Sequence, residues 1–354
     1  MPKIGGRLDA YSLKEFIGPF MACIGGFTII LVSGLLFELT DLILIRRVPA
    51  EAVLRMLVCK LPGIAVLALP VGVLFGTLLA LGRLVKDGEL TVVRALGRSF
   101  PRIAAPFLLA GLLVSLVVFW ANESIVPRSN HAYENLVRRY ILQEVTPLIR
   151  EQVFFKGADN CFYYIEGVDG DLLRGIFIYD PHARLITARE GSIGEGYWRL
   201  EDGILRELDD EGFVVMEVGF ASLHFPVPER LDAYLSQQKT TDEMNRRELG
   251  EHIQLFAGSG VNLIPVLVDY HLKLALPLAS LIFALLAAPL GTWSSGRFFG
   301  ITASLIVVFA YYVLTALCRS LGINAVLPPL AAAWVPNCTL AALGAYLLWR
   351  VDRI

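Results

Sequence analysis

The stretch LPGIAVLALPVGVLFGTLLALG at residues 61–82 decides the fold, because it carries no charged side chain and only one hydroxyl group. A helix rises about 1.5 Å per residue, so a run of this length spans the ~30 Å hydrocarbon core of a bilayer. Five further runs share its character, at about 16–37, 103–120, 274–292, 300–318 and 330–349. The sequence therefore predicts an α-helical membrane protein with six transmembrane helices.

The composition agrees with a membrane protein and argues against several other classes. Of the 354 residues 55% are hydrophobic and 18% charged, and the mean hydropathy is +0.60. Soluble domains carry about 25% charged residues. The net charge of -2 and the lack of a charged tail give no reason to expect a nucleic-acid partner. The five cysteines stand at no metal or redox spacing, so we expect no metal site.

A segment of different composition separates the third apolar run from the fourth, and we expect a domain there at residues 121–269. Spans one to three then fall in residues 1–120 and spans four to six in residues 270–354. An amphipathic pattern at 129–145 predicts a connecting helix. Short apolar runs over about 151–228 indicate an all-β, jelly-roll-like domain. The expected strands are 152–156, 161–166, 175–179, 184–189, 197–200 and 213–225.

The inserted domain contains sequence signals for turns and for the start of a helix. Turns are predicted at the pairs Asp169-Gly170, Asp202-Gly203 and Glu211-Gly212. Thr240 and Glu243 have the spacing of a capping box, which predicts a return helix running toward Phe256.

The basic residues of the short loops predict the orientation. One side of the predicted membrane holds eleven Lys and Arg residues, and the short loops of the other side hold five. Because Lys and Arg accumulate on the cytoplasmic side, both termini are expected in the cytoplasm. The β domain then lies outside, in the periplasm of a Gram-negative cell, and the chain lies in the inner membrane.

Several functions are disfavoured by what the six runs lack. None contains Asp, Glu, Lys, Arg or His, whereas an ion-coupled transporter usually needs such a group near the bilayer midplane. The chain has no GxxxxGK[ST] motif for a nucleotide and no HExxH motif. We therefore expect a non-enzymatic protein with no catalytic residue and no cofactor of its own.

The segment RLVKDGELTVVRALG at residues 83–97 predicts a short cytoplasmic helix at about 87–97. Asp87 suits the N-cap, Glu89 suits the first turn, and Gly97 suits the C′ position. An apolar face is expected from Leu90, Val93 and Leu96.

This short helix has two possible interpretations. It can dock into a groove of a partner ATPase, or it can rest on lipid headgroups through Arg94 and Arg98. Glu89 weighs against the second interpretation, because an acid gains nothing from anionic lipid. Glu89 can also pair with Lys86, which is worth only a few tenths of a kcal/mol.

At this point the sequence resembles the LptF/LptG permease family over nearly its whole length. The stretch GRLVKDGELTVVRALG at 82–97 resembles the coupling-helix motif of that family, and LPPLAAAWVPN at 327–337 its last-helix motif. LKLALPLA at 272–279 matches the opening of the fourth helix. LDAYSLKEF at 8–16 matches the family's entry, with Ala10 in place of the usual arginine, and FYYI at 162–165 matches the β domain.

The resemblance implies a permease subunit that extracts lipopolysaccharide from the inner membrane. It implies a heterodimer with a second such permease, two copies of a cytoplasmic ABC ATPase that hold ATP and Mg²⁺, and a periplasmic jelly-roll bridge that receives the lipid. Glu89 takes the position of the coupling glutamate that contacts the ATPase. The first and fifth helices line a lateral gate. The neighbours of Glu89 expected in the coupling site are Asp87, Leu90, Arg94 and Gly97.

Three functions therefore compete: the lipopolysaccharide permease, a membrane-anchored scaffold whose β domain binds an envelope protein, and an ABC permease for a macrolide or lipoprotein. A passive scaffold needs no ATPase contact, and lipoprotein-type permeases typically carry four spans. The run ELTVVR at 89–94 looks F-like, but the choice between an F and a G subunit is left open.

A basic pair, Arg46 and Arg47, follows the first span on its outer side, where the positive-inside rule disfavours it. Snorkelling at the interface is one explanation. The other is bidentate contact with lipopolysaccharide phosphates, restrained by Glu38 and Asp41 until lipid arrives. Both explanations stay open.

Overall fold

The computed structural model describes residues 4–44, 48–141, 153–156, 161–169, 172–180, 184–194, 197–209, 213–226, 239–256, 262–293 and 297–353. Contacts divide the chain into two compact units. The helical unit comprises Met1–Ile43, Pro49–Asn130 and Met244–Ile354, and the sheet unit takes in His131–Glu243 with the short Leu44–Val48 segment. The inserted unit is thus narrower at both ends than the expected range of 121–269.

All six predicted spans lie in helices that are long and apolar enough to cross a membrane. These are α1 (Ile4–Leu44), α2 (Ala50–Lys86), α4 (Phe100–Ser124), the run α8 (Ile264–Ala275), η3 (Leu276–Leu278) and α9 (Ala279–Thr292), α10 (Arg297–Ile323) and α11 (Pro329–Arg353). Shorter helices are α3 (Glu89–Ala95), α5 (Val126–Ile141), η2 (Thr241–Glu243) and α7 (Arg246–Phe256). The prediction of a six-span helical membrane protein with an inserted β domain is confirmed.

Small residues let the helices of this unit approach closely, as is usual where lipid gives no hydrophobic drive for association. A Cβ added to Gly76 of α2 would lie 2.7 Å from the ring of Phe16 in α1, and one added to Gly72 would lie 2.8 Å from Ile24. Gly111 of α4 meets Ala284 of α9 in the same way, at 2.7 Å. The aromatic ring of Phe16 therefore packs directly against Gly76, and Phe16 is 4% exposed.

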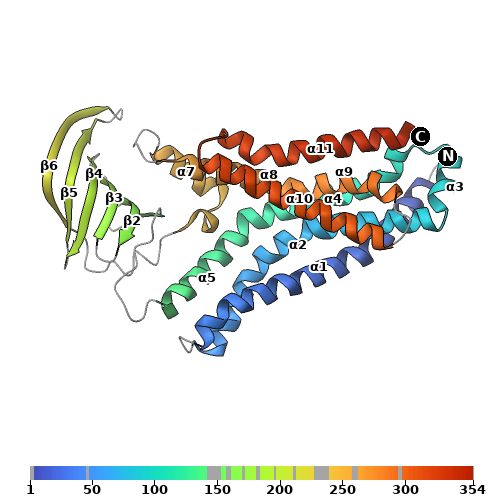
Figure 1. Cartoon of the computed structure of the whole chain (residues 1–354), viewed down its shortest axis with the longest axis horizontal. Coiled ribbons are helices and arrows are strands. Elements are labelled where there is room, and N and C mark those ends of the chain that lie inside the picture. The colour runs from blue at the N-terminus through green and yellow to red at the C-terminus, as the bar shows by residue number, and fades with distance from the viewer. Residues whose placement is uncertain are drawn as a thin grey trace. The chain divides into compact units, whose positions relative to one another are not determined.

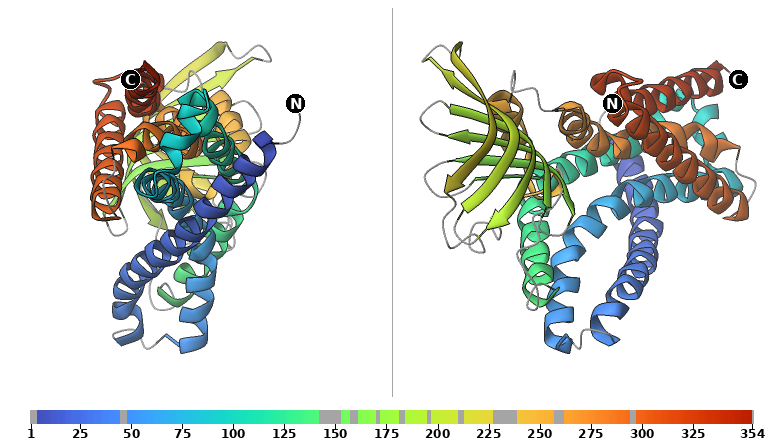
Figure 2. Two further views of the ribbon diagram at one scale, coloured as in Figure 1. Left: turned by 90° about the vertical axis from the view of Figure 1, so that its right-hand side faces the viewer. Right: turned by 60° about the vertical axis from the view of Figure 1, so that its left-hand side comes forward.

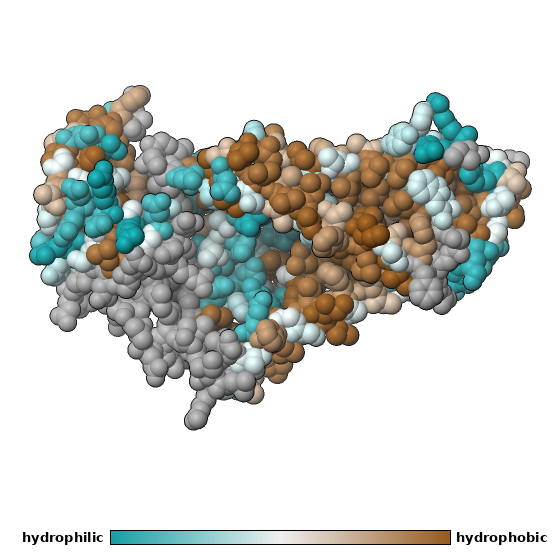
Figure 3. Space-filling view, viewed as in Figure 1, coloured by the Kyte–Doolittle hydropathy of each residue, from teal (hydrophilic) through white to brown (hydrophobic). Residues whose placement is uncertain are grey.

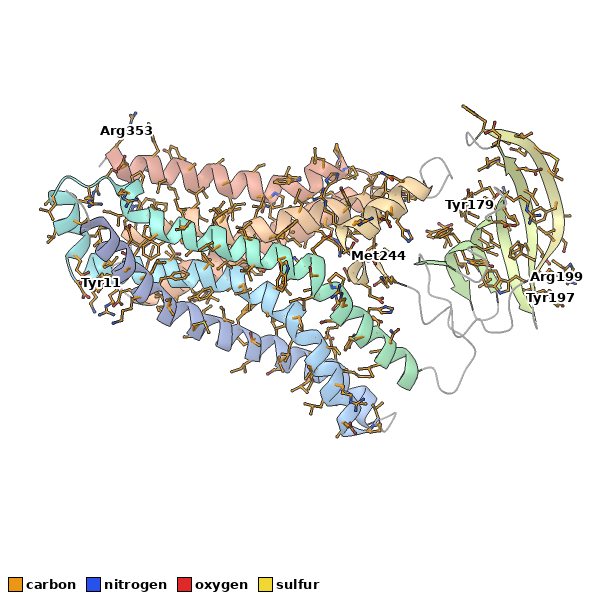
Figure 4. All side chains as sticks on the ribbon, turned by 180° about the vertical axis from the view of Figure 1, so that it is seen from behind. Tyr11, Tyr179, Tyr197, Arg199, Met244 and Arg353 are labelled. Atoms are coloured by element: carbon orange, nitrogen blue, oxygen red, sulfur yellow. The ribbon has the colours of Figure 1, made fainter. Side chains whose placement is uncertain are left out.

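The start of α1, the helix α3 and the end of α11 lie at one end of the helical unit, which we name the α3 end (Figure 1). Tyr11 of α1 and Arg353 of α11 mark it in the side-chain view (Figure 4). Hydrophobic residues cover most of the visible face of the helical unit, and hydrophilic ones gather at the α3 end (Figure 3). The pattern fits an apolar band that ends in a polar cap.

The fourth span is broken by a short 3-10 turn, because Pro277 brings no backbone N–H. The N–H of Ala279 donates to the carbonyl of Leu276, which leaves the carbonyl of Ala275 without its usual helical donor. That carbonyl accepts instead from the side-chain amide of Asn337 in α11, at 2.6 Å. The amide oxygen of Asn337 in turn accepts from the hydroxyl of Tyr311 in α10, at 3.0 Å. A buried side-chain network thus repairs the break and joins three spans.

The sheet unit holds one six-stranded antiparallel sheet in the order β1-β2-β3-β4-β5-β6, which is one curved layer in Figure 2. Its strands are β1 (Val153–Lys156), β2 (Phe162–Asp169), β3 (Leu172–Asp180), β4 (Arg184–Gly194), β5 (Tyr197–Leu208) and β6 (Val214–Pro226). Every expected strand is present. The described strands form a meander, without the exchange between two sheets that a complete jelly roll requires.

One face of this sheet carries a compact apolar cluster. Tyr163 and Trp198 pack edge to face with ring centroids 5.4 Å apart, and both side chains are at most 3% exposed. The other buried members come from β2 to β5 and the residue before β2, namely Cys161, Ile165, Leu173, Ile176, Ile178, Ile186, Ala188 and Leu200. Alternation along each strand therefore sets which face is apolar.

Two local predictions are wrong. Asp202-Gly203 is not a turn: both residues lie inside β5, where Asp202 has a positive φ of 54° and the strand continues past it. The return helix does not start from Thr240. The carboxylate of Glu243 does accept from the Thr240 N–H at 3.1 Å, but only the 3-10 turn η2 follows. The working capping box is formed by Asn245 and Glu248, whose side chains and backbone N–H groups bond reciprocally at 2.8 and 2.9 Å.

Candidate functional site

The predicted coupling segment forms α3, and its ends differ in part from the prediction. Gly88 is the N-cap, with φ 76°, and no side chain caps the helix. Asp87 was expected at that position, but its carboxylate instead accepts from Arg83 at 3.4 Å. Gly97 has φ 81°, and its N–H bonds the carbonyl of Arg94 at 2.9 Å, so the prediction of a left-handed glycine after the helix is confirmed.

One face of α3 is fastened to the helical unit. Leu90 is 8% exposed and belongs to the core cluster that includes Phe100 and Val351. The guanidinium of Arg94 donates to the backbone carbonyl of Val351 in α11, at 3.1 Å. Arg94 was expected to face a partner, and the structure turns its guanidinium toward α11 instead.

The other face of α3 is open. Val92 is 61% exposed and Leu96 is 79% exposed, and the two stand four residues apart. Glu89 lies three residues before Val92 at the start of the same face. The three residues of the expected apolar face differ in exposure, since Leu90 is buried, Val93 is half-buried and Leu96 is exposed. We name Glu89, Val92 and Leu96 the docking face.

Glu89 has a partner that the sequence analysis missed. The hydroxyl of Tyr11 in α1 donates to its carboxylate at 3.0 Å, across 78 positions of the chain. No spacing rule joins α1 to α3 across this distance in the sequence. Only the resemblance of both segments to one family had indicated that they belong together. The bond ties the docking face to the first span.

Two further ion pairs hold the start of α1 at the α3 end. Arg83, near the end of α2, bonds the carboxylate of Glu15 as well as that of Asp87. Arg102 at the start of α4 bonds Asp9 at 3.1 Å. Each such pair contributes little by itself at a surface. Together with Tyr11 they connect about two turns of α1 to α3 and to the residues that flank it.

The second predicted site cannot be placed on the structure. Arg46 and Arg47 fall outside the described residues, and so does the side chain of Asp41. Glu38 is exposed near the end of α1. Among the described residues no group of three or more His, Cys, Asp or Glu is arranged to hold a metal ion.

Comparison with known proteins assigns the family. The profile of the lipopolysaccharide export system permease LptF/LptG family matches residues 10–350. The lipopolysaccharide export system permease protein LptF of Escherichia coli is 22% identical over 334 residues, covering 85% of this chain and 84% of that protein. LptG of Escherichia coli is 23% identical over 299 residues, covering 79% and 81%. The two identities do not separate F from G. The chain belongs to the lipopolysaccharide export system permease LptF/LptG family.

Proposed function

We propose that the chain is a permease subunit of an ABC transporter that extracts lipopolysaccharide from the inner membrane and passes it to a periplasmic bridge. A partner ATPase dimer binds ATP and Mg²⁺ and supplies the energy. The observation that carries the proposal is the docking face: an acid and two exposed apolar side chains project from a helix whose opposite face is fastened to the membrane spans.

A helix of this kind suits a groove on a soluble partner. Helix-in-groove recognition uses apolar anchors three and four positions apart, and Val92 and Leu96 provide them. Glu89 adds a charge for a basic side chain of the partner. The resemblance of the surrounding motif to a coupling helix supports an ATPase as that partner, and the proposal then requires the α3 end to lie in the cytoplasm.

The excess of Lys and Arg at the α3 end supports that orientation, with both termini in the cytoplasm and the β domain in the periplasm. The apolar surface left on α1 and α10 suits contact with lipid or with the second permease of the proposed heterodimer. Ile29 and Phe37 of α1 are 68% and 82% exposed, and Phe309 of α10 is 72% exposed. We propose that lipid enters beside these helices and that Arg46 and Arg47 meet its phosphates.

The proposed function is tested by co-purification. The full-length chain, extracted in mild detergent from cells that co-express the partner proteins, is expected to bring down an ATPase at one dimer per pair of permeases. A scaffold without transport activity brings down none. The measurement is the stoichiometry of the purified complex, with ATP hydrolysis as the second readout.

Removal of the Tyr11 hydroxyl is expected to loosen the link between α1 and the docking face. The variant Tyr11→Phe keeps Glu89 available, so ATPase co-purification stays close to the parent. The bond is exposed to solvent and so contributes little by itself, and we expect lipid release per ATP hydrolysed to fall by only about two- to fivefold. Tyr346→Phe, on the exposed face of α11, is the matched control. An unchanged ratio of lipid released to ATP hydrolysed would remove Tyr11 from the coupling path.

The sheet supplies the proposed contact with the periplasmic bridge. β6 is an outer strand of the six-stranded order and pairs with β5 along its length. Its first half exposes apolar side chains, with Val215 at 69% and Val218 at 45%. Among the described strands none pairs with the outer edge of β6, and such an edge can template the addition of a strand from a partner.

Photo-crosslinking residues placed at Phe213, Val215 and Val218 are therefore expected to trap a periplasmic partner in growing cells. The same residue at Glu190, exposed on the inner strand β4, is expected to trap none. Equal crosslinking at Glu190 and along β6, or none along β6, would move the contact away from this edge.

A further inference from the structure

A cavity of about 570 Å³ lies at the α3 end of the helical unit, between α1 and α2 with Ile301 of α10 at its border. Its charged lining consists of Lys14 and Glu15 from α1 and of Arg83, Lys86 and Asp87 from the end of α2 and the turn after it. None of these side chains belongs to the docking face. The cavity is large enough for a headgroup and the first atoms of a lipid.

The lining changes character along the two helices. On α1 it passes from Lys14 to Gly18 and Ala22, and on α2 it passes from Lys86 back to Leu79. Seven to eight residues of helix correspond to about 12 Å. One end of the cavity is therefore charged, and the other, deeper in the apolar band, is lined by small and apolar groups. A soluble anion needs only the charged end, whereas a glycerophospholipid fits both.

Some of the charged side chains at the polar end already have ion-pair partners, and others do not. Arg83 already bonds the carboxylates of both Glu15 and Asp87. Lys14 and Lys86 are exposed, and neither has an ion-pair partner within the described part of the chain. Three basic side chains against two acidic ones leave the cavity with a net positive charge. The two lysine ammonium groups are the donors that remain for a ligand.

We propose that this cavity binds an anionic glycerophospholipid, with its phosphate held by the ammonium groups of Lys14 and Lys86. The glycerol and the first acyl carbons lie along Gly18 and Ala22, where no side chain fills the space. Basic pockets between membrane helices on the cytoplasmic side recognise lipid headgroups in this way. Only the assignment to the cytoplasmic leaflet rests on the proposed function.

Native mass spectrometry of the full-length protein in detergent tests the proposal. The delipidated protein is titrated with palmitoyl-oleoyl phosphatidylglycerol, with the phosphatidylethanolamine of the same chains, and with sodium phosphate. One phosphatidylglycerol molecule is expected to bind at least about tenfold more tightly than phosphatidylethanolamine, which equals ~1.4 kcal/mol. Sodium phosphate is expected to compete with it only weakly. Binding of phosphate as tight as that of the lipid would overturn the lipid assignment.

Two pairs of variants separate the headgroup from the apolar end. Lys14→Gln with Lys86→Gln is expected to lower phosphatidylglycerol affinity by about tenfold or more, whereas Arg350→Gln with Arg353→Gln removes two charges at the same end and leaves it unchanged. Gly18→Leu fills the apolar end, since a Cβ there meets nothing within 4 Å. It is expected to weaken lipid binding, whereas Gly25→Leu, equally open on the same helix but outside the cavity, does not.

An equal loss of phosphatidylglycerol affinity in a test variant and its control would contradict the proposal. Unchanged phosphatidylglycerol affinity in the double lysine variant would also contradict it. ATPase co-purification is measured on the same preparations. A protein that binds the lipid but no ATPase supports the lipid site and contradicts the proposed function. A protein that binds the ATPase but no lipid supports the proposed function and contradicts the lipid site.

Discussion

The variant Glu89→Ala is expected to lose its partner ATPase on detergent extraction while its membrane insertion and yield stay normal. Glu89 is the charged member of the docking face, and within the described chain its carboxylate accepts one side-chain hydrogen bond, from the exposed hydroxyl of Tyr11. Its loss is therefore expected to have little effect on the fold. Truncating one partner of a desolvated charge pair at an interface costs ~2–5 kcal/mol. The association constant then falls by about thirtyfold or more. Lipopolysaccharide export in cells is expected to fall with it.

Glu51→Ala is the matched control for this experiment. Glu51 also stands in the first turn of a helix and is exposed, but it lies at the start of α2, where it pairs with Arg55. A second variant, Val92→Asp with Leu96→Asp, tests the apolar part of the docking face without touching Glu89. Normal ATPase recovery in both docking-face variants would exclude α3 as the contact, and equal loss in Glu51→Ala would mean that the assay reports folding.

The variant Asn337→Leu is expected to lower the stability of the helical unit by ~2 kcal/mol and to reduce its recovery from the membrane. Leucine has a similar size but removes the acceptor of the Tyr311 hydroxyl and the side-chain donor to the carbonyl of Ala275 in an apolar interior. An orphaned buried polar group costs ~1–3 kcal/mol, although hydrogen bonds between membrane helices contribute only ~0.6 kcal/mol on average when measured directly. Thermal unfolding of the detergent-extracted protein measures the loss.

Asn324→Leu controls for the substitution itself, because Asn324 is exposed and its amide bonds only the carbonyl of Ser320 nearby. Tyr311→Phe removes one partner of the network and is expected to cost less than Asn337→Leu. The double variant then lacks one of the orphaned groups, so its loss is smaller than the sum of the two single losses. Strict additivity would show that Tyr311 and Asn337 do not act together.

The architecture was predictable because the signals that define it are local. The length and apolarity of six runs mark the spans, and alternation between turn signals marks the strands. The predictions were wrong where one local sequence pattern is compatible with two different structures. Asp202-Gly203 has turn composition, yet pairing with β4 and β6 on both sides keeps it inside a strand. Thr240 and Glu243 have capping spacing, yet Asn245 and Glu248 offer the same bonds five residues later.

The candidate site was predictable only in part, because its contacts join distant positions. The position of Glu89 follows from the segment 83–97, but its bond to Tyr11 depends on how α1 packs against α2. Helical periodicity predicts which residues of α3 share a face and does not show which face turns inward. The burial of Leu90 and the bond from Arg94 to Val351 settle that direction, and they depend on α11, some 250 positions later.

The strand order of the sheet has a consequence for biosynthesis. Each described strand pairs with the next one along the chain, so no strand of the sheet waits for a segment made much later. Contacts between sequence neighbours close short loops and form early. In the proposed orientation the sheet can therefore fold as soon as it has left the ribosome and crossed the membrane, before α8 to α11 are synthesised. The last three spans then insert with the soluble unit already folded, and an error in their insertion does not require the sheet to be rebuilt.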